Sequence, residues 1–478
     1  MRDLINKFNR QNQKRPSSHR RVFHKKGKKI RRNDDASAAS VSAELKANWD
    51  LSQFKVPPAE GKTRFHDFDL PNPLLRAISD LGFEYCTPIQ AKILPSSLAG
   101  KDASGRAQTG TGKTAAFLIT VITRMLNSPI QNKRQPGTPR VLILAPTREL
   151  VLQISEEARH LCKYTDLKII SVLGGIDYKK QRTQLSTGSV DVVVATPGRL
   201  LDFQRRRDIT LKKIEVLIID EADRMLDMGF IPDVRKIIYS TPEKNKRQTL
   251  LFSATLTGEI TRLASQWTRN SVTVEIEPEQ IAVETVDQVI YIVTSSNKFA
   301  LLYNIIHRQN LERVLIFCNR RDEVRTLAKM LTQHGINCST LSGDIPQKKR
   351  IRRLDAFKTG KIRILVATDV AGRGIHIEGM NHVINFMLPH DPENYVHRIG
   401  RTGRAGATGT SVSFADEKDA FYIPDIEAFI EQKLSCIEPE DEWLTMPKPT
   451  PEWKKRRSRP RRTPVPITKR KSPRHLSK

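Results

Sequence analysis

The chain has 478 residues, and its 81 Lys and Arg residues outnumber its 52 Asp and Glu residues to give a formal charge of +29. No run approaches the roughly 18 consecutive apolar residues of a membrane span, and the N-terminal residues lack the apolar core of a secretory signal. Five scattered cysteines without a Cys-x-x-Cys pair argue against a disulfide framework and a zinc site. We therefore expect a cytoplasmic protein.

The positive charge is concentrated at the two ends of the chain. Residues 1–32 and residues 446–478 each contain 13 basic residues and one acidic residue, which leaves 55 basic and 50 acidic residues for positions 33–445. Polycationic segments bind polyanions by releasing condensed counterions, so the composition predicts a nucleic-acid partner. Segments that only aid solubility and segments that bind an anionic membrane surface are the alternatives, although neither end has the apolar face of a membrane anchor.

The chain begins with a basic segment, residues 1–60, whose lack of periodicity predicts a disordered tail. Over residues 61–277, short β-branched or aliphatic runs alternate with helical patterns, which predicts a mostly parallel sheet with helices on both faces. The strands that we expect in this first domain are 141–144, 169–173, 190–194, 216–219 and 249–252.

A second α/β domain is predicted over residues 287–437, after an acidic, proline-containing linker at 278–286. Its expected strands are 289–293, 314–317, 364–366, 382–386 and 410–414, and a helix is expected over 322–334. Residues 438–478 are predicted to form a second basic disordered tail, because the sequence becomes rich in Pro, Arg and Lys after residue 447.

A phosphate-binding loop is the strongest local motif of the first domain. The segment reads Ala107-Gln108-Thr109-Gly110-Thr111-Gly112-Lys113-Thr114. Its glycines allow backbone N–H groups to surround a phosphate, Lys113 can reach the outer phosphates, and the hydroxyl of Thr114 can bind Mg²⁺. Ala107 replaces the first glycine of the usual pattern. The motif predicts nucleotide binding, and a chance glycine-rich turn is the alternative.

Carboxylates follow the predicted strand 216–219, at the strand end where parallel sheets bind ligands. Asp220 can hold Mg²⁺, and Glu221 can orient and deprotonate an attacking water. In isolation, an acidic loop that solvates a strand end would explain these residues equally well. The phosphate loop upstream favours the catalytic interpretation.

The run Asp220-Glu221-Ala222-Asp223 resembles the signature of the DEAD-box RNA helicases of superfamily 2, and the resemblance covers about residues 63–433. It implies two tandem RecA-like domains, with ATP and Mg²⁺ as cofactors. Residues 82–90 (GFEYCTPIQ) resemble the Q motif of this family. The resemblance implies that Gln90 pairs with the adenine edge and that Phe65 stacks on the ring, which would favour ATP over GTP.

Two further motifs of the same family occur in the family's order. Ser253-Ala254-Thr255 resembles the motif that couples ATP hydrolysis to strand separation, together with Asp223 and His397. Residues 397–404 (HRIGRTGR) resemble the arginine-finger motif. The resemblance implies that Arg401 and Arg404 approach the γ-phosphate when the two domains close.

Further segments resemble the family's RNA-facing turns, which contact phosphates and 2′-hydroxyls without reading the base sequence. Each segment alone would be an ordinary turn. The implied RNA-binding residues are Pro146, Thr147, Arg148, Gly175, Thr196, Pro197, Gly198, Arg199, Gly343, Gln347, Arg350, Thr368 and Gly374.

Departures from the family pattern narrow the resemblance. His376 stands where most members have an Asp that contacts the ribose, and together with residues 343–350 and Cys86 it resembles the bacterial branch that works in the RNA degradosome with ribonuclease E. The implied function is local unwinding of short RNA duplexes by ATP- and RNA-driven closure of the two domains. An ATP-gated RNA clamp with little turnover, a helicase of ribosome assembly and a DNA translocase are the alternatives.

Overall fold

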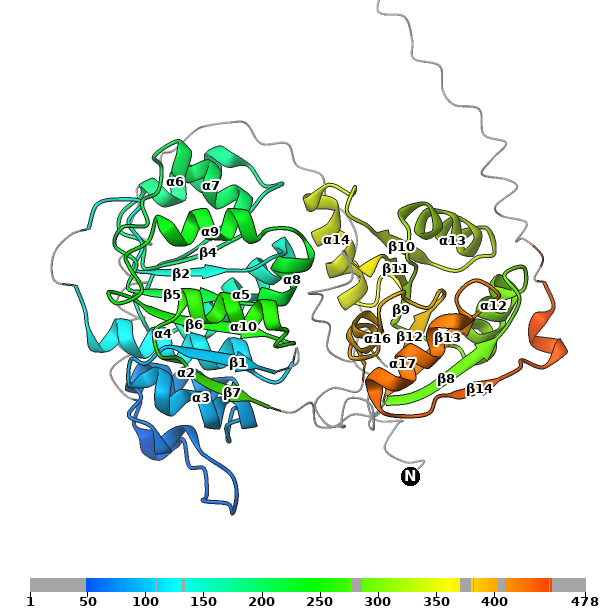
Figure 1. The fold of residues 1–478 in the computed structure, drawn as a ribbon, viewed down its shortest axis with the longest axis horizontal. Coiled ribbons are helices and arrows are strands. Elements are labelled where there is room, and N and C mark those ends of the chain that lie inside the picture. The colour runs from blue at the N-terminus through cyan, green and yellow to red at the C-terminus, as the bar shows by residue number, and fades with distance from the viewer. Residues whose placement is uncertain are drawn as a thin grey trace, which may run out of the picture. The chain divides into compact units, whose positions relative to one another are not determined.

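Two seven-stranded sheets, in which all strand pairs are parallel, organise this computed structural model (Figure 1). The structure describes residues 49–107, 110–130, 134–276, 286–369, 380, 382–402, 409–446 and 448. Helices cover both faces of each sheet, as predicted. The predicted class, an α/β protein with two tandem parallel sheets, is therefore confirmed.

The first sheet has the strand order β3-β4-β2-β5-β6-β1-β7. Its domain contains, in chain order, η1 (Leu51–Gln53), η2 (Phe65–Asp67), α2 (Asn72–Asp80), α3 (Pro88–Leu98), β1 (Ala103–Arg106), α4 (Lys113–Asn127), β2 (Val141–Leu144), α5 (Arg148–Leu161), β3 (Ile169–Val172), α6 (Tyr178–Ser186), β4 (Val192–Ala195), α7 (Pro197–Arg205), β5 (Val216–Ile219), α8 (Ala222–Asp227), α9 (Ile231–Tyr239), β6 (Gln248–Ser253), α10 (Gly258–Trp267) and β7 (Val272–Glu275).

The central strands of this sheet are apolar at every position because both of their faces are buried. Alternate residues point to opposite faces, so Leu142, Val193 and Leu217 share one core with α7, α9 and α10. Their neighbours, such as Ile143 and Ile218, are equally buried on the other face. The sheet is thereby fixed as a rigid support for the loops at its edge.

The second sheet has the strand order β10-β11-β9-β12-β13-β8-β14. Its domain contains β8 (Val286–Ile292), α12 (Lys298–Arg308), β9 (Val314–Phe317), α13 (Arg321–Gln333), β10 (Cys338–Leu341), α14 (Gln347–Lys358), β11 (Ile364–Ala367), β12 (His382–Asn385), α16 (Pro392–Ile399), β13 (Gly409–Ala415), η3 (Ala420–Tyr422), α17 (Ile423–Ile430), β14 (Ser435–Ile437) and η4 (Asp441–Leu444).

The two sheets share one topology. When the strands of each sheet are numbered in chain order, both sheets read third, fourth, second, fifth, sixth, first, seventh. Strand β8 is therefore the counterpart of β1. The helix after β1 begins at Lys113, and the helix after β8 begins at Lys298, so these two lysines occupy equivalent places.

Parts of both segments that were predicted as disordered tails are ordered in the structure. Residues 1–60 were predicted to be disordered, but Phe54 and Val56 are buried and the Tyr85 hydroxyl donates to the Pro57 carbonyl over 2.8 Å. Residues 438–478 were predicted to be disordered, but Trp443 of η4 packs on the second core and its carbonyl accepts from Asn304 of α12 over 2.8 Å. In both segments, a few apolar residues within a polar sequence pack against the folded protein. The amino-acid composition of a segment does not predict such packing.

The predicted linker at 278–286 lies outside the described residues except for Val286, which begins β8. Within the described ranges, no helix combines the length and the apolar composition that a bilayer span requires.

Candidate functional site

The functional motifs gather at one edge of the first sheet, because all of its strands run in the same direction and end there. Each motif begins directly after a strand. The residues that start them are Ala107 after β1, Ala145 after β2, Leu173 after β3, Thr196 after β4, Asp220 after β5 and Ala254 after β6.

The phosphate loop leads from β1 into α4. Lys113 is the first residue of this helix and is buried, and its ammonium donates to the Ala107 carbonyl at the start of the loop. Gly112 has φ of 92°, a conformation that favours glycine. The positive end of α4 and the Lys113 ammonium thus point at the same place, which is the arrangement that binds a phosphate.

Gln90 holds this loop from the neighbouring helix α3. Its amide nitrogen donates to the Gly112 carbonyl over 3.1 Å, and its amide oxygen accepts from the Thr87 N–H over 2.9 Å. A Cβ at position 112 would lie 2.5 Å from the Gln90 nitrogen, so the contact requires glycine there. The structure therefore brings Gln90 to the phosphate loop, while its predicted pairing with adenine stays a prediction.

Phe65 is a buried aromatic residue of the first domain. Its ring is completely buried and stacks on Phe83, with 6.4 Å between the ring centroids. Its predicted stacking on a base therefore lacks an exposed ring face, and the described conformation gives Phe65 a packing role.

Asp220 and Glu221 are adjacent buried carboxylates in different environments. Burial raises the pKa of Asp220 to about 7, although Lys113 counteracts this effect. Burial is also the largest influence on the pKa of Glu221 and acts to raise it, but Arg224, Lys113 and Arg401 together outweigh burial and lower this pKa. Two neighbouring carboxylates with opposite shifts are typical of sites where each has its own chemical role.

Glu221 adopts a strained backbone conformation at the turn from β5 into α8. Its φ of 52° and ψ of 55° lie in the left-handed region, which costs a non-glycine residue about 1 kcal/mol. Its N–H donates to the Asp220 carboxylate over 3.0 Å, and its own carboxylate accepts from Arg224 over 2.6 Å. These contacts hold the carboxylate in place, and strain of this kind is concentrated at functional sites.

Asp223 joins this turn to the residues that follow β6. One of its carboxylate oxygens accepts from the N–H groups of Ala254 and Thr255 over 2.8 and 3.0 Å, and the Asp223 N–H donates to the Ser253 hydroxyl over 3.3 Å. The structure thus brings together three of the four predicted coupling residues. A shift of either segment must move the other.

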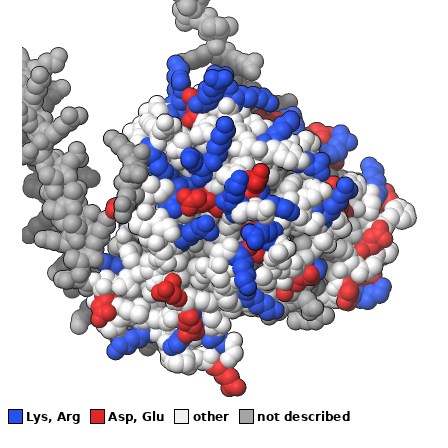
Figure 2. Space-filling model, turned by 60° about the vertical axis from the view of Figure 1, so that its left-hand side comes forward, with Lys and Arg blue, Asp and Glu red and all other residues white. Residues whose placement is uncertain are grey.

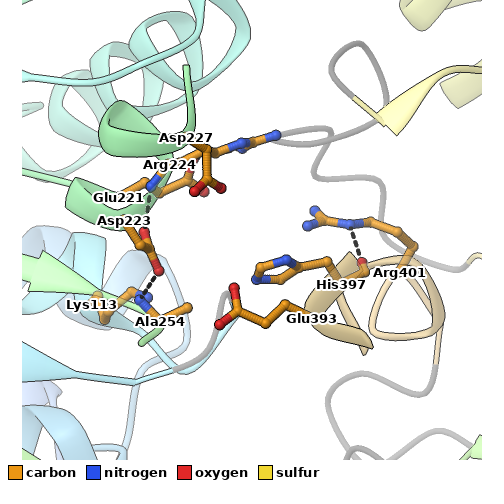
Figure 3. Close-up of a pocket in the computed structure, with 9 residues that line it drawn as sticks. All are labelled: Lys113, Glu221, Asp223, Arg224, Asp227, Ala254, Glu393, His397 and Arg401. Carbon is orange, nitrogen blue, oxygen red and sulfur yellow. Dashed lines mark hydrogen bonds and ion pairs between the residues drawn. The ribbon is translucent and has the colours of Figure 1, made fainter. Parts of the chain in front are cut away.

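A pocket between the two sheets collects the catalytic candidates (Figure 3). The first domain contributes Lys113, Glu221, Asp223, Arg224, Asp227 and Ala254, and the second contributes Glu393, His397 and Arg401. His397 is therefore the fourth coupling residue at this place. Arg401 is buried, and its Nε donates to the His397 carbonyl over 3.1 Å.

Comparisons with known proteins agree with this site. The family model described as DEAD/DEAH box helicase matches residues 87–263, and the model described as helicase conserved C-terminal domain matches residues 297–406. The protein from Pseudomonas aeruginosa called ATP-dependent RNA helicase RhlB is 59% identical over 83% of this chain and 99% of its own length. The chain belongs to the DEAD-box helicase family.

Proteins with lower sequence identity also match this chain. A protein of the same RhlB name from Xanthomonas oryzae is 47% identical over 80% of this chain and 67% of its own length. The solved structure of S. cerevisiae Dbp5 bound to RNA and ADP BeF3 is 29% identical, with a TM-score of 0.71 over 80% of this chain and 97% of its own. The RecA-like fold and the predicted likeness to bacterial helicases of the RhlB name are confirmed, and the protein is an enzyme of an ATP-hydrolysing class.

The donor set of this DEAD-box site fits a magnesium nucleotide. Among the described residues, no cluster of three or more His, Cys, Asp or Glu side chains forms a complete metal cage. Mg²⁺ does not need one, because it usually binds one or two carboxylates and completes its shell with water and substrate phosphates. Asp220 and the Thr114 hydroxyl at the start of α4 would hold it.

The second domain of the DEAD-box fold adds a residue that the sequence reasoning missed. Arg398 is almost fully buried and binds both carboxylate oxygens of Asp369 over 2.6 and 2.7 Å. It also donates to Asn319 and to the Met387 carbonyl, each over 2.7 Å. Arg398 therefore fixes α16, the helix that carries His397, to the ends of three strands.

Three pocket residues were also missed, namely Glu393, Arg224 and Asp227. Glu393 lies four residues before His397 in α16, so the two share one helical face. Arg224 and Asp227 lie one and four residues after the acidic run, in α8. Helical spacing from the known motifs was the signal that could have found them.

The predicted RNA contacts divide into exposed and buried residues. Gly175, Gly198 and Gly343 are exposed, and Arg148, Thr196 and Arg199 are partly exposed. Pro146, Thr147, Pro197 and Thr368 are buried, and Thr147 caps α5 by accepting from the Leu150 N–H over 3.3 Å. The exposed residues follow β3, β4 and β10, at the carboxyl edges of the two sheets.

Gln347 and Arg350 correct the prediction that they face RNA. In the structure, 1% of Gln347 and 8% of Arg350 are exposed, and both contact Glu149 of the first domain. The amide of Gln347 donates to the Glu149 carboxylate over 2.8 Å, and Arg350 forms an ion pair with it at 3.0 Å. These side chains therefore connect the two domains, and the buried partner Glu149 was not predicted.

Several predicted residues lie outside the described part of the chain. They are Gln108 and Thr109 of the phosphate loop, Gly374 of the RNA set, Arg404 of the arginine-finger motif, and His376. Their roles stay predictions.

Proposed function

We propose that the protein is an ATP-dependent RNA helicase that locally unwinds short duplexes when ATP and RNA close its two domains. One observation carries the proposal. Lys113 and Glu221 of the first domain line the same pocket as His397 and Arg401 of the second domain. A site assembled from both domains is complete only when they are together, so closure controls catalysis.

The roles within this site follow from the side chains. Lys113 and the positive end of α4 bind the outer phosphates of ATP. Glu221, ionised because Arg224 lowers its pKa, accepts the proton of the attacking water. Arg401 stabilises the charge that develops on the transferred phosphoryl group. Mg²⁺, when bound by Asp220 and Thr114, neutralises charge on the phosphates.

RNA would lie across the exposed edge formed by Gly175, Arg199 and Gly343. Contacts from backbone N–H groups and arginines fix the geometry of one strand but do not read its sequence. If closure bends that strand, a short duplex loses its pairing locally, and hydrolysis then reopens the domains. We place this activity in the bacterial cytoplasm and in RNA degradation together with ribonuclease E, as the resemblance of His376, Cys86 and residues 343–350 to that bacterial branch implies.

The test is steady-state ATPase activity of the purified chain alone, with RNA and with DNA of the same sequence. We expect RNA to raise the rate by about tenfold or more, a part of the roughly 10³–10⁵ that an arginine finger can supply. Equal stimulation by DNA would favour a translocase, and no turnover with any nucleic acid would favour a clamp. A sample with a ribonuclease E scaffold fragment tests the degradosome role, which requires further stimulation.

The contact between Glu149 and Arg350 provides a second test. In Arg350→Met, closure must bury the Glu149 carboxylate without its partner, and breaking a buried pair costs roughly 3–5 kcal/mol. We expect RNA-stimulated ATPase activity to fall by about 100-fold, since each 1.4 kcal/mol is a factor of ten. Arg352→Met, an exposed neighbour on α14, is the matched control and should keep its activity.

The double variant Glu149→Gln/Arg350→Met separates this ion pair from other effects. It leaves no unpaired charge, so it should be more active than either single variant. If the fold loss of activity in the double variant equals the product of the fold losses in the two single variants, the Glu149–Arg350 ion pair does not stabilise the closed state.

A further inference from the structure

A basic surface on the first domain remains outside the proposed functional site. It is formed by α6 and the end of α7, and we call it the α6–α7 surface, defined by Lys179, Lys180, Arg182, Arg205, Arg206 and Arg207. All six are exposed. Residues 176–213 contain nine Lys and Arg and four Asp and no Glu, a net charge of +5 that equals the net charge of the whole segment 33–445.

The acidic residues of this region are used within the fold. Asp177 caps α6, Asp208 accepts from Arg182 over 2.7 Å, Asp191 is paired with Arg134, and Asp202 is paired with Arg205 at 3.9 Å. Among the described residues, Lys179, Lys180 and Arg207 have no carboxylate within ion-pair distance. Figure 2 shows Lys and Arg gathered in the upper part of the molecule, the level at which α6 and α7 lie in Figure 1. The surface therefore presents positive charge that the protein itself does not neutralise.

Tyr178 makes this surface continuous with the predicted RNA edge. Its ring stacks on Phe203 of α7 with 4.4 Å between the centroids, and its hydroxyl donates to Asp208 over 2.6 Å. The guanidinium groups of Arg206 and Arg199 lie 4.9 and 5.7 Å from the ring centre. One aromatic ring thus orders the arginine predicted to bind RNA and an arginine of the α6–α7 surface.

We propose that the α6–α7 surface binds the phosphate backbone of RNA that continues beyond the strand held at the sheet edge. This inference rests on the proposed RNA-binding function. Helix α7 has nine residues and is therefore about 13 Å long, which corresponds to roughly four phosphates at the 3.4 Å spacing of a helical strand. Arg199 and Arg205 to Arg207, near its two ends, can therefore contact successive parts of one strand.

The test uses the full chain with Lys179→Gln, Lys180→Gln and Arg207→Gln combined. These side chains are exposed and unpaired among the described residues, so the substitutions leave the core unchanged, which a thermal melt verifies. The matched control combines Lys244→Gln, Lys329→Gln and Lys361→Gln, which removes the same charge from exposed positions elsewhere. Affinity is measured with a non-hydrolysable ATP analogue across a salt series.

Two RNAs separate the surface from the core site: a single strand of about ten nucleotides, within the range that one single-strand site covers, and its extension to about thirty. We expect the surface variant to bind the short strand like the parent and the long strand about tenfold more weakly. The slope of log affinity against log salt should decrease by roughly two for the long strand, at 0.7 per lost phosphate contact.

Three results would overturn the inference. The first is unchanged affinity and salt slope for the long strand, and the second is an equal loss in the control variant. The third is an equal loss for the short strand, which would place these lysines in the core site. If the parent chain bound neither RNA, the proposed function itself would fail.

Discussion

Replacing Glu221 by Gln is expected to abolish ATP turnover while ATP and RNA still bind. The carboxylate lies in the pocket with Lys113 and Arg401, and Arg224 holds its pKa below the usual range, so it is ionised at neutral pH. The Gln amide keeps an oxygen for the Arg224 hydrogen bond but accepts no proton. Loss of a general base costs about 10²–10⁴ in rate, which single-turnover hydrolysis with saturating RNA measures.

Glu221→Asp is the matched variant for this experiment. It retains a carboxylate but withdraws it by one methylene, so its rate should lie between those of the parent and the Gln variant. RNA binding in the presence of ATP should survive in both variants. Unchanged turnover in the Gln variant would contradict the assignment, and loss of RNA binding together with turnover would give Glu221 a binding role.

The strands that could be predicted from the sequence are those that their own residues identify, without their neighbours in the sheet. Val141–Leu144, Val216–Ile219 and Val314–Phe317 are apolar at every position, and the structure has these strands at the same bounds. Strand β1, with the sequence Ala-Ser-Gly-Arg, gave no such signal. It is a strand because β6 and β7 pair with it on both sides, and Gly105 leaves space for the ring of Phe252.

The residues of the candidate site divide in the same way, into those that a contiguous motif predicts and those that only the fold brings together. The phosphate loop and the acidic run were found because each motif is contiguous in sequence. The left-handed conformation of Glu221 and the hydrogen bonds of Arg398 depend on how strand ends meet in space, which no local pattern encodes. Gln347 was assigned to RNA from the resemblance of its segment to the family's RNA-facing turns. Its partner Glu149 lies 198 residues away in the chain, so no local pattern predicts their contact.

Because the two sheets share one topology, Lys298 of the second domain can be compared with Lys113 of the first. The sequence around Lys298 does not suggest this comparison. Lys113, at the equivalent place, lies at the proposed phosphate site. The Lys298 ammonium is 2.9 Å from the carboxylates of both Asp416 and Asp419, and all three side chains are buried. In the second domain, two carboxylates of the protein itself thus occupy the place where we propose that the first domain binds phosphate.

Lys298→Met is therefore expected to destabilise the second domain strongly. The substitution leaves two buried carboxylates without a cation, and breaking a buried ion pair costs roughly 3–5 kcal/mol. Hydrogen exchange of α12 and β13 in the full chain measures the effect. We expect the exchange rates there to increase by about 100-fold or more, at a factor of ten for each 1.4 kcal/mol, while β2 and β5 of the first domain keep their protection.

The pH dependence of this variant distinguishes charge from lost packing. Burial raises the pKa of Asp416, but the hydrogen bond from Lys298 leads the interactions that outweigh it and lower this pKa to about 2. In the parent, the stabilisation from this depressed pKa is present above the ordinary Asp range and is lost only as pH falls toward 2. Burial already raises the pKa of Asp419 in the parent, although Lys298 counteracts it. Without the lysine, burial also raises the pKa of Asp416 above its unfolded value, so acidification should stabilise the variant and narrow its difference from the parent.

A second substitution provides the decisive control. Lys298→Met/Asp416→Asn removes one carboxylate together with the ammonium, and Asp419 retains the N–H groups of Leu388 and Asp416 as donors at 3.0 and 2.6 Å. We expect it to recover part of the lost protection at neutral pH. If the single variant exchanges like the parent, or if acidification widens the difference, the carboxylates do not depend on Lys298 and the equivalence of the two lysines is topological only.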